Sequence, residues 1–259
     1  MHDRWSGALS SLGFFTALPV PAPMAAEHAM QRALRWCPLT GCILAAGATA
    51  VAAVASWLYP GGAGNLIAAT LAVSSVVVAT RGLHLDGLAD TADGLGPMAG
   101  RQRALTVMRQ PDIGPFGVAA LVLVLLLQVT ALARALDVHR GLPAVAESVL
   151  VGRLAMMRAG VPGIPAARPE GLGMAMAGSV PIPLVVVFAA ALAIAAGAPA
   201  LLGHPTLAWH LLIGLPAGMA VAELVLRLAV RRLGGVTGDV FGAVCEVASA
   251  GTLLAVAAA

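Results

Sequence analysis

A bundle of membrane-spanning α-helices is the fold class that this sequence predicts. Of its 259 residues, 59% are hydrophobic and only 10% are charged, and the mean hydropathy is +0.92. Soluble domains carry about 25% charged residues. The apolar residues form long continuous runs, without the alternation of a membrane β-barrel. We therefore expect residues 1–259 to form one all-α integral-membrane domain with about seven transmembrane helices.

Seven apolar runs approach the length of roughly 20 residues that crosses the hydrocarbon core. The fourth run is the most polar, because it carries Glu147 and Arg153. In chain order the seven runs are Leu39–Leu58, Asn65–Thr80, Phe116–Leu136, Leu142–Met157, Ile182–Leu202, Leu207–Leu226 and Phe241–Ala259.

The N-terminal residues precede these runs and have some features of a signal peptide, since Arg4 is followed by an apolar stretch. That stretch contains three serines and leads into a segment with Pro19, Pro21 and Pro23. We therefore interpret residues 5–20 as a re-entrant or interfacial helix.

Arginine and cysteine usage argues against a nucleic-acid-binding protein and against a disulfide-rich one. The net charge of +3 and the pI of 9.2 come from arginine without lysine, a bias of composition that does not indicate nucleic-acid binding. The three cysteines, Cys37, Cys42 and Cys245, form no CxxC pair. We expect them to be small packing residues and expect no disulfide framework.

Arginine placement also predicts the orientation, because cytoplasmic loops of membrane proteins are enriched in basic residues. Only Arg134 and Arg140 fall toward one side of the seven predicted spans. We therefore expect the other side, which includes the N terminus, to be cytoplasmic and the C terminus to be periplasmic. The arginines on that cytoplasmic side are Arg32, Arg35, Arg81, Arg101, Arg103, Arg109, Arg168, Arg231 and Arg232.

The stretch Arg81–Gly96, RGLHLDGLADTADGLG, carries the strongest functional pattern. Asp86, Asp90 and Asp93 are spaced by four and three residues, which places them on one face of a helix. Three like charges on one face repel, whereas a divalent cation such as Mg²⁺ or Mn²⁺ binds carboxylate oxygens. The alternative is a solvated acidic helix end, but the flanking sequence is apolar. We predict that these three aspartates are catalytic metal ligands.

A second acidic pair lies in Gly234–Glu246, GGVTGDVFGAVCE. Asp239 and Glu246 are seven residues apart and share a helix face, and the glycines around them permit close packing. Thr237 can cap the helix that begins near Asp239. We predict that both acids are catalytic and complete the first cluster, either by holding a second metal ion or by accepting a proton. Thr237 and Gly238 are candidate substrate contacts.

Three other residues are candidate substrate contacts. Arg109 lies in the irregular segment Met108–Gly117, whose guanidinium and backbone N–H groups suit a phosphate, although an ordinary basic flank is the alternative. Arg153 interrupts an apolar run, so it faces a cavity or pairs with an acid such as Glu147. His84 precedes Asp86 by two residues, and binding phosphate, acid–base chemistry and an interfacial position all remain open for it.

These motifs resemble those of the adenosylcobinamide-GDP ribazoletransferase family, also called cobalamin synthases. His84–Gly94 reads HLDGLADTADG and matches the family pattern H-L-D-G-x-x-D-x-x-D-G, and Gly234–Glu246 matches G-G-x-T-G-D-x-x-G-A-x-x-E. Phe15–Pro21, Met108–Gly117 and Glu170–Gly173 resemble shorter family motifs. The chain departs from them at Ala17, Gln110 and Asp112, where the family usually has arginine, aspartate and arginine.

The resemblance implies transfer of the adenosylcobinamide-phosphate moiety of adenosylcobinamide-GDP to α-ribazole or α-ribazole 5′-phosphate. The products would be adenosylcobalamin or its 5′-phosphate, and GMP. It also implies Mg²⁺ as cofactor and the bacterial inner membrane as location, with the active site facing the cytoplasm. Phosphoryl transfer of this kind needs charge neutralisation and an in-line nucleophile, which the acidic clusters suit.

Two other functions remain open at the level of sequence. A CDP-alcohol-type phospholipid phosphotransferase also uses aspartates on membrane helices, but its motif D-G-x-x-A-R is not completed here, because the residues after Ala89 are Asp90 and Thr91. An ion-coupled secondary transporter would place acids near the bilayer midplane, whereas this acidic stretch follows a predicted span. Membrane lipid is the expected surrounding, nucleic acid is not an expected partner, and a homo-oligomer is compatible with the sequence.

Overall fold

The computed structural model describes residues 6–21, 28–96 and 100–258. The regular structure in these residues is helical, apart from an isolated parallel bridge between Ala166 and Val236. The all-α fold class that the sequence predicts is therefore confirmed. All three cysteines are free, as expected, and Cys37 and Cys245 are buried in the packing.

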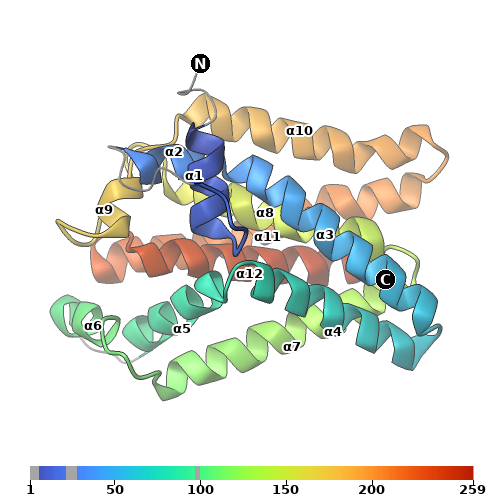
Figure 1. The fold of residues 1–259 in the computed structure, drawn as a ribbon, viewed down its shortest axis with the longest axis horizontal. Coiled ribbons are helices and arrows are strands. Elements are labelled where there is room, and N and C mark those ends of the chain that lie inside the picture. The colour runs from blue at the N-terminus through green and yellow to red at the C-terminus, as the bar shows by residue number, and fades with distance from the viewer. Residues whose placement is uncertain (1–5, 22–27, 97–99, 259) are drawn as a thin grey trace.

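Long helices lie roughly along one axis, and successive long helices run in opposite directions (Figure 1). Short connections join α3 to α4, α7 to α8, α10 to α11 and α11 to α12. These long helices are α3 (Cys37–Leu58), α4 (Gly62–Ala79), α7 (Pro115–Asp137), α8 (Gly141–Ala159), α10 (Ile182–Leu201), α11 (Pro205–Leu233) and α12 (Gly238–Ala257).

Six of the described helices combine the length and apolar character of a membrane span, so the chain is a multi-pass membrane protein. The sequence predicts seven spans, and the exception is α8, which carries Glu147, Arg153 and Arg158. With 19 residues, α8 is about 28 Å long and close to the hydrocarbon thickness. Most of its residues are buried against α3, α11 and α12. Those neighbours provide the apolar surroundings of α8, which is why its own composition can be more polar.

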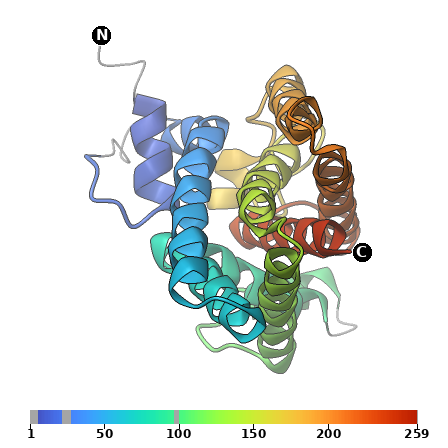
Figure 2. The same cartoon turned by 90° about the vertical axis from the view of Figure 1, so that its right-hand side faces the viewer.

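Short helices gather at one end of the bundle (Figures 1 and 2). α1 has 10 residues, too few to cross a membrane, and lies across the long axis. It occupies residues 6–15 of the stretch 5–20, of which Trp5 lies outside the described residues, and the re-entrant or interfacial position of this stretch stays a prediction. The short helices are α1 (Ser6–Phe15), α2 (Ala29–Arg35), α5 (Leu83–Leu95), α6 (Arg101–Val107) and α9 (Leu172–Met176).

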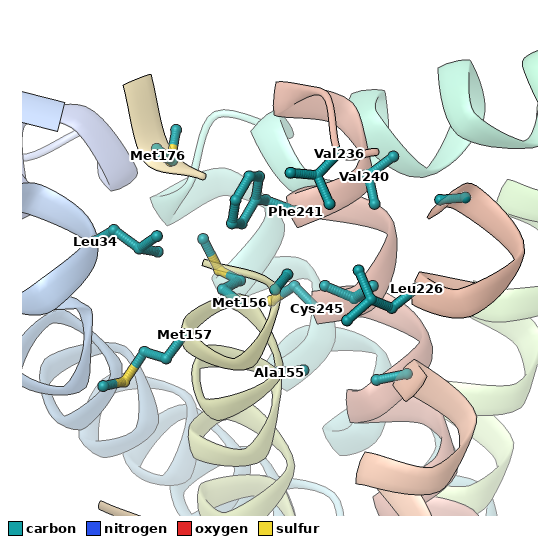
Figure 3. Close-up of a cluster of buried hydrophobic side chains, with 14 of the residues drawn as sticks. Leu34, Ala155, Met156, Met157, Met176, Leu226, Val236, Val240, Phe241 and Cys245 are labelled. Atoms are coloured by element: carbon teal, nitrogen blue, oxygen red, sulfur yellow. The ribbon is translucent and has the colours of Figure 1, made fainter. Parts of the chain in front are cut away.

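The core beneath this end is packed around α12. In the most apolar part of α12, 67% of the residues are buried, against 11% in α10, so α12 is central and α10 is peripheral. Phe241 of α12 is 1% exposed and lies among Met156 of α8, Leu226 of α11 and Met176 of α9 (Figure 3). Burial of large apolar side chains on this scale fixes the position of α12 against its neighbours.

α5 crosses α12 at two glycines. A Cβ atom on Gly87 would lie 2.6 Å from the carbonyl oxygen of Asp239, and one on Gly242 would lie 2.8 Å from the carbonyl oxygen of His84. Side-chain carbon atoms do not approach backbone oxygens so closely, so both positions require glycine. The two acidic stretches, far apart in the sequence, are therefore in direct contact.

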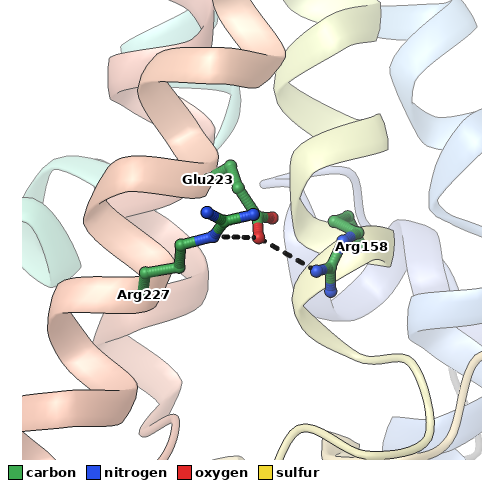
Figure 4. A network of polar contacts seen from close by, with 3 residues as sticks. All are labelled: Arg158, Glu223 and Arg227. Atoms are coloured by element: carbon green, nitrogen blue, oxygen red, sulfur yellow. Dashed lines mark hydrogen bonds and ion pairs between the residues drawn. The ribbon is translucent and has the colours of Figure 1, made fainter.

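An ion network joins α8 to α11 (Figure 4). The Glu223 carboxylate accepts from Arg158 Nη2 at 3.1 Å and from Arg227 Nε at 2.9 Å. The Arg158 side chain is 32% exposed, whereas that of Arg227 is 73% exposed. The Arg158–Glu223 pair joins the two helices, whereas the more exposed Arg227–Glu223 pair lies within α11.

Replacing Gly87 by alanine should destabilise the protein, because the new methyl group would push α5 away from α12. We expect Gly87→Ala to lower the free energy of unfolding by about 1–3 kcal/mol, measured by chemical denaturation of the purified protein in detergent. Gly47→Ala in α3 is the matched control, since a Cβ there meets no atom within 4 Å. Equal stability of the two variants would contradict the close crossing.

Removing the shared carboxylate of the ion network should also destabilise the bundle. Glu223→Gln leaves the partly buried Arg158 without its charge partner, and we expect a loss of about 1–3 kcal/mol in the free energy of unfolding. Arg227→Gln removes the exposed pair alone and should cost less than about 1 kcal/mol. The reverse order of the two losses would show that the inter-helix pair contributes little.

Candidate active site

Asp86 and Asp90 of α5 and Asp239 in the first turn of α12 form the centre of the site. Burial, and then the negative charges of Asp239, Asp86 and Asp93, raise the pKa of Asp90 to about 6, while the positive charge of Arg168 opposes this effect. Asp86 is exposed, and Asp90 and Asp239 are half-buried. Like charges held this close repel, so the cluster suits a divalent cation or another positively charged partner.

Asp93 differs from the other two aspartates of α5. It is buried, and its two carboxylate oxygens accept from the backbone N–H of Gly114 at 2.7 Å and of Gly117 at 2.9 Å. These N–H groups lie at the start of α7, where a helix favours negative charge. The sequence suggests that the Met108–Gly117 loop offers backbone N–H groups to phosphate, but Asp93 occupies two of them. Asp93 therefore ties α5 to α7, and its predicted role as a metal ligand stays a prediction.

The start of α12 is organised by Thr237. Its hydroxyl oxygen accepts from the Val240 N–H at 3.4 Å, which confirms the predicted helix cap. The same hydroxyl donates to Asp239 Oδ2 at 3.0 Å and so orients that carboxylate. Gly238 packs closely against Leu172 of α9. The cap therefore holds the Asp239 carboxylate at the edge of the site.

Two cavities open beside this edge. One of about 400 Å³ is lined in part by Arg109, Arg168, Glu170, Thr237 and Gly238. A larger one of about 690 Å³ shares Arg109, Arg168 and Glu170. Three of the predicted substrate contacts, Arg109, Thr237 and Gly238, are thus brought together on one cavity. Arg109 Nη2 lies 2.9 Å from Glu170 Oε1, in an exposed ion pair.

Glu246 does not join this cluster. Seven residues further along α12 than Asp239, it lies about 10 Å deeper along the helix axis. Its carboxylate accepts from Gln128 Nε2 of α7 at 2.8 Å. The spacing of Asp239 and Glu246 predicts a shared helix face, but the structure separates their side chains into an outer and an inner group.

Arg153 belongs to the inner group. It is 3% exposed, its Nη1 donates to the Val149 carbonyl at 3.3 Å, and its charge acts on Glu246. The carboxylate of Glu147 has no hydrogen-bond partner within the described residues, so the suggested pairing with Arg153 is not formed. A small cavity of about 30 Å³ lies between Gln128, Arg153 and Glu246 and has room for about one water molecule. The structure therefore places Arg153 away from the cavities beside Asp239.

His84 also faces inward. It is 2% exposed, its ring stacks on Phe15 with centroids 6.2 Å apart, and burial followed by the charge of Arg153 lowers its pKa to about 3. Potential ligand atoms of His84, Cys245 and Glu246 lie within 4.8 Å of one another, as in some metal sites. The guanidinium of Arg153 acts on all three residues, and this neighbouring positive charge disfavours a cation there.

Arg168 is the residue of the outer site that sequence reasoning did not select. The positive charge of Arg168 attracts the carboxylates of both Asp239 and Asp90, and its side chain lines both cavities. Burial and then the charge of Arg109 lower its pKa from the usual value. The available signal is its position just before Glu170–Gly173, which resembles a short family motif.

Comparisons with known proteins show to which family the chain belongs. The family model for cobalamin-5-phosphate synthase matches residues 7–257. Proteins named adenosylcobinamide-GDP ribazoletransferase are similar over almost their whole length: that of Frankia casuarinae is 37% identical over 96% of this chain and 94% of its own, and that of a Nocardioides species is 40% identical over 100% of both. No solved structure matches this chain. Because the family model and these relatives cover nearly all of its length, the chain belongs to the cobalamin-5-phosphate synthase family.

Proposed function

We propose that this protein transfers the adenosylcobinamide-phosphate moiety of adenosylcobinamide-GDP to α-ribazole or α-ribazole 5′-phosphate. The products are adenosylcobalamin or its 5′-phosphate, and GMP. The observation that carries the proposal is the contact between the two acidic family motifs, where Gly87 of α5 packs on Asp239 of α12. The full-length similarity to proteins named adenosylcobinamide-GDP ribazoletransferase supports the same substrates.

Asp86 and Asp90 would hold the Mg²⁺ ion, with Asp93 at the rim of the cluster. Carboxylate oxygens are the ligands that this ion prefers. Burial, followed by the negative charges of the neighbouring acids, raises the pKa of Asp90, which supports a shared cluster. When bound, Mg²⁺ would neutralise the charge of the diphosphate oxygens.

The residues of the chain position the reactants for a single displacement. The hydroxyl oxygen of the ribazole forms a bond to the phosphorus on the cobinamide side, the bridging bond to GMP breaks, and GMP leaves with that electron pair. The hydroxyl proton passes to a carboxylate. Asp239 fits this role better than Glu246, because Thr237 orients its carboxylate beside the cavities whereas Glu246 is hydrogen-bonded to Gln128. Arg109 lines the same cavity and would contact the diphosphate.

The proposed location is the bacterial inner membrane, with the site facing the cytoplasm. Arginines of α6, of the loop before α9 and of the C-terminal end of α11 occur at the end of the bundle that holds the acidic cluster. Basic residues concentrate on the cytoplasmic side of membrane proteins, which supports this orientation.

Loss of either central aspartate of α5 should nearly abolish transfer. Asp86→Asn and Asp90→Asn keep the side-chain shape but remove a charge from the cluster, so we expect at least about a hundredfold loss of GMP release by purified protein supplied with both substrates. Asp112→Asn, in an exposed loop, is the control and should keep its rate. Near-normal rates for both cluster variants at saturating Mg²⁺ would rule out the assignment.

Reporter fusions should reveal the orientation. A reporter after Ala259 should read as periplasmic, and one inserted within residues 160–179 should read as cytoplasmic, because α10, α11 and α12 lie between the two positions. Both reporters on the same side, or the reverse pattern, would be incompatible with the proposed topology.

A further inference from the structure

The larger cavity beside the acidic cluster has the charge of an anion site. Its volume is about 690 Å³, within the usual range for small-molecule sites. It lies between α6 and the loop before α9, and its lining includes Arg101, Arg109 and Arg168. Among the described residues that line this cavity, Glu170 is the only acidic one, so the arginines give the lining a positive formal charge.

Two of these arginines are held in place by reciprocal contacts. Arg101 of α6 donates from Nη2 to the carbonyl of Ala167 in the loop at 3.0 Å. Arg168 of the loop donates from Nη2 to the carbonyl of Leu105 in α6 at 2.7 Å. Each guanidinium thus ties the two walls together with one nitrogen, and its other N–H groups are not used in these bonds. The positive charges are therefore preorganised on the cavity before a ligand arrives.

Arg168 also faces the reacting groups. Its charge acts on Asp90 and Asp239, and it lines both the larger cavity and the smaller one that reaches Thr237. Its Nε atom is buried and has no hydrogen-bond partner within the described residues. A buried donor without an acceptor is unfavourable, so an acceptor supplied by a ligand would complete this group.

We propose that the larger cavity binds the guanosine-phosphate half of the donor and that Arg168 contacts the phosphate that leaves in GMP. This inference rests on the proposed function and assigns the nucleotide side of that site. Fixed guanidinium groups suit phosphate, because their planar N–H donors match its oxygens. Gln102 and Thr106, exposed on α6, provide an amide and a hydroxyl on the part of the wall that can face the nucleoside. The phosphate thereby lies toward the aspartates and the nucleoside lies toward α6.

Binding of GMP to the purified full chain tests this assignment without requiring turnover. In nanodiscs of zwitterionic lipid, we expect Arg168→Gln and Arg101→Gln each to weaken GMP binding by about tenfold or more, measured by calorimetry. Arg103→Gln is the matched control, because Arg103 is exposed on the same helix but does not line this cavity. Unfolding midpoints equal to that of the wild type would show that the weakened variants are folded.

The outcomes separate this assignment from its alternatives. Unchanged GMP affinity in Arg168→Gln would overturn it. An affinity for GMP that is equal in all arginine variants, together with weaker binding of phosphatidylglycerol by Arg168→Gln, would overturn it in favour of a lipid-headgroup site. Failure of the wild-type protein to transfer, with GMP binding that depends on Arg168, would reject the proposed function and leave the nucleotide site in place.

Discussion

The site depends on the close crossing of α5 and α12. Gly87 and Gly242 leave no side chain between the two backbones, and any larger residue would overlap the carbonyl oxygens of Asp239 or His84. Four carboxylates at this crossing repel one another, which opposes the approach of the helices. The opposing stabilisation comes from the far side of α12, where Phe241 and its neighbours are packed without exposure to solvent. Packing of the core therefore holds the charges in an arrangement that they would not adopt alone.

The acidic side chains near this crossing have different surroundings. Asp93 is satisfied by two backbone N–H groups of α7, and Glu246 by the amide of Gln128. Asp86, Asp90 and Asp239 face the outer side, where the opposing charge is that of Arg168. The protein thus neutralises the acids that support the fold with its own donors. Of the outer acids, Asp239 accepts one hydrogen bond from the Thr237 hydroxyl, and the cluster suits the cation that we propose for it.

Those features that a single helix determines can be predicted from the sequence. The all-α class, the acidic face of α5 and the Thr237 cap follow from local periodicity and spacing. The separation of Glu246 from Asp239 cannot be predicted in this way, because their spacing on one helix does not reveal which neighbouring helix each side chain contacts. The partner of Asp93 and the position of Arg168 depend likewise on tertiary contacts. The polar composition of α8 also depends on tertiary contacts, because most of its residues are buried against neighbouring helices and do not contact lipid.

The inner polar group determines how the helices that carry the outer site are positioned. Arg153 of α8 lies close enough to Glu246 of α12 for its positive charge to act on that carboxyl group. Gln128 of α7 donates to the Glu246 carboxylate, and His84 of α5 lies beside the same group. A shift of α12 relative to α7 would separate the buried Glu246 carboxylate from Gln128, which is costly away from water. Because Asp239 lies two turns from Glu246 on the same rigid helix, the inner contacts fix the height at which Asp239 meets the aspartates of α5.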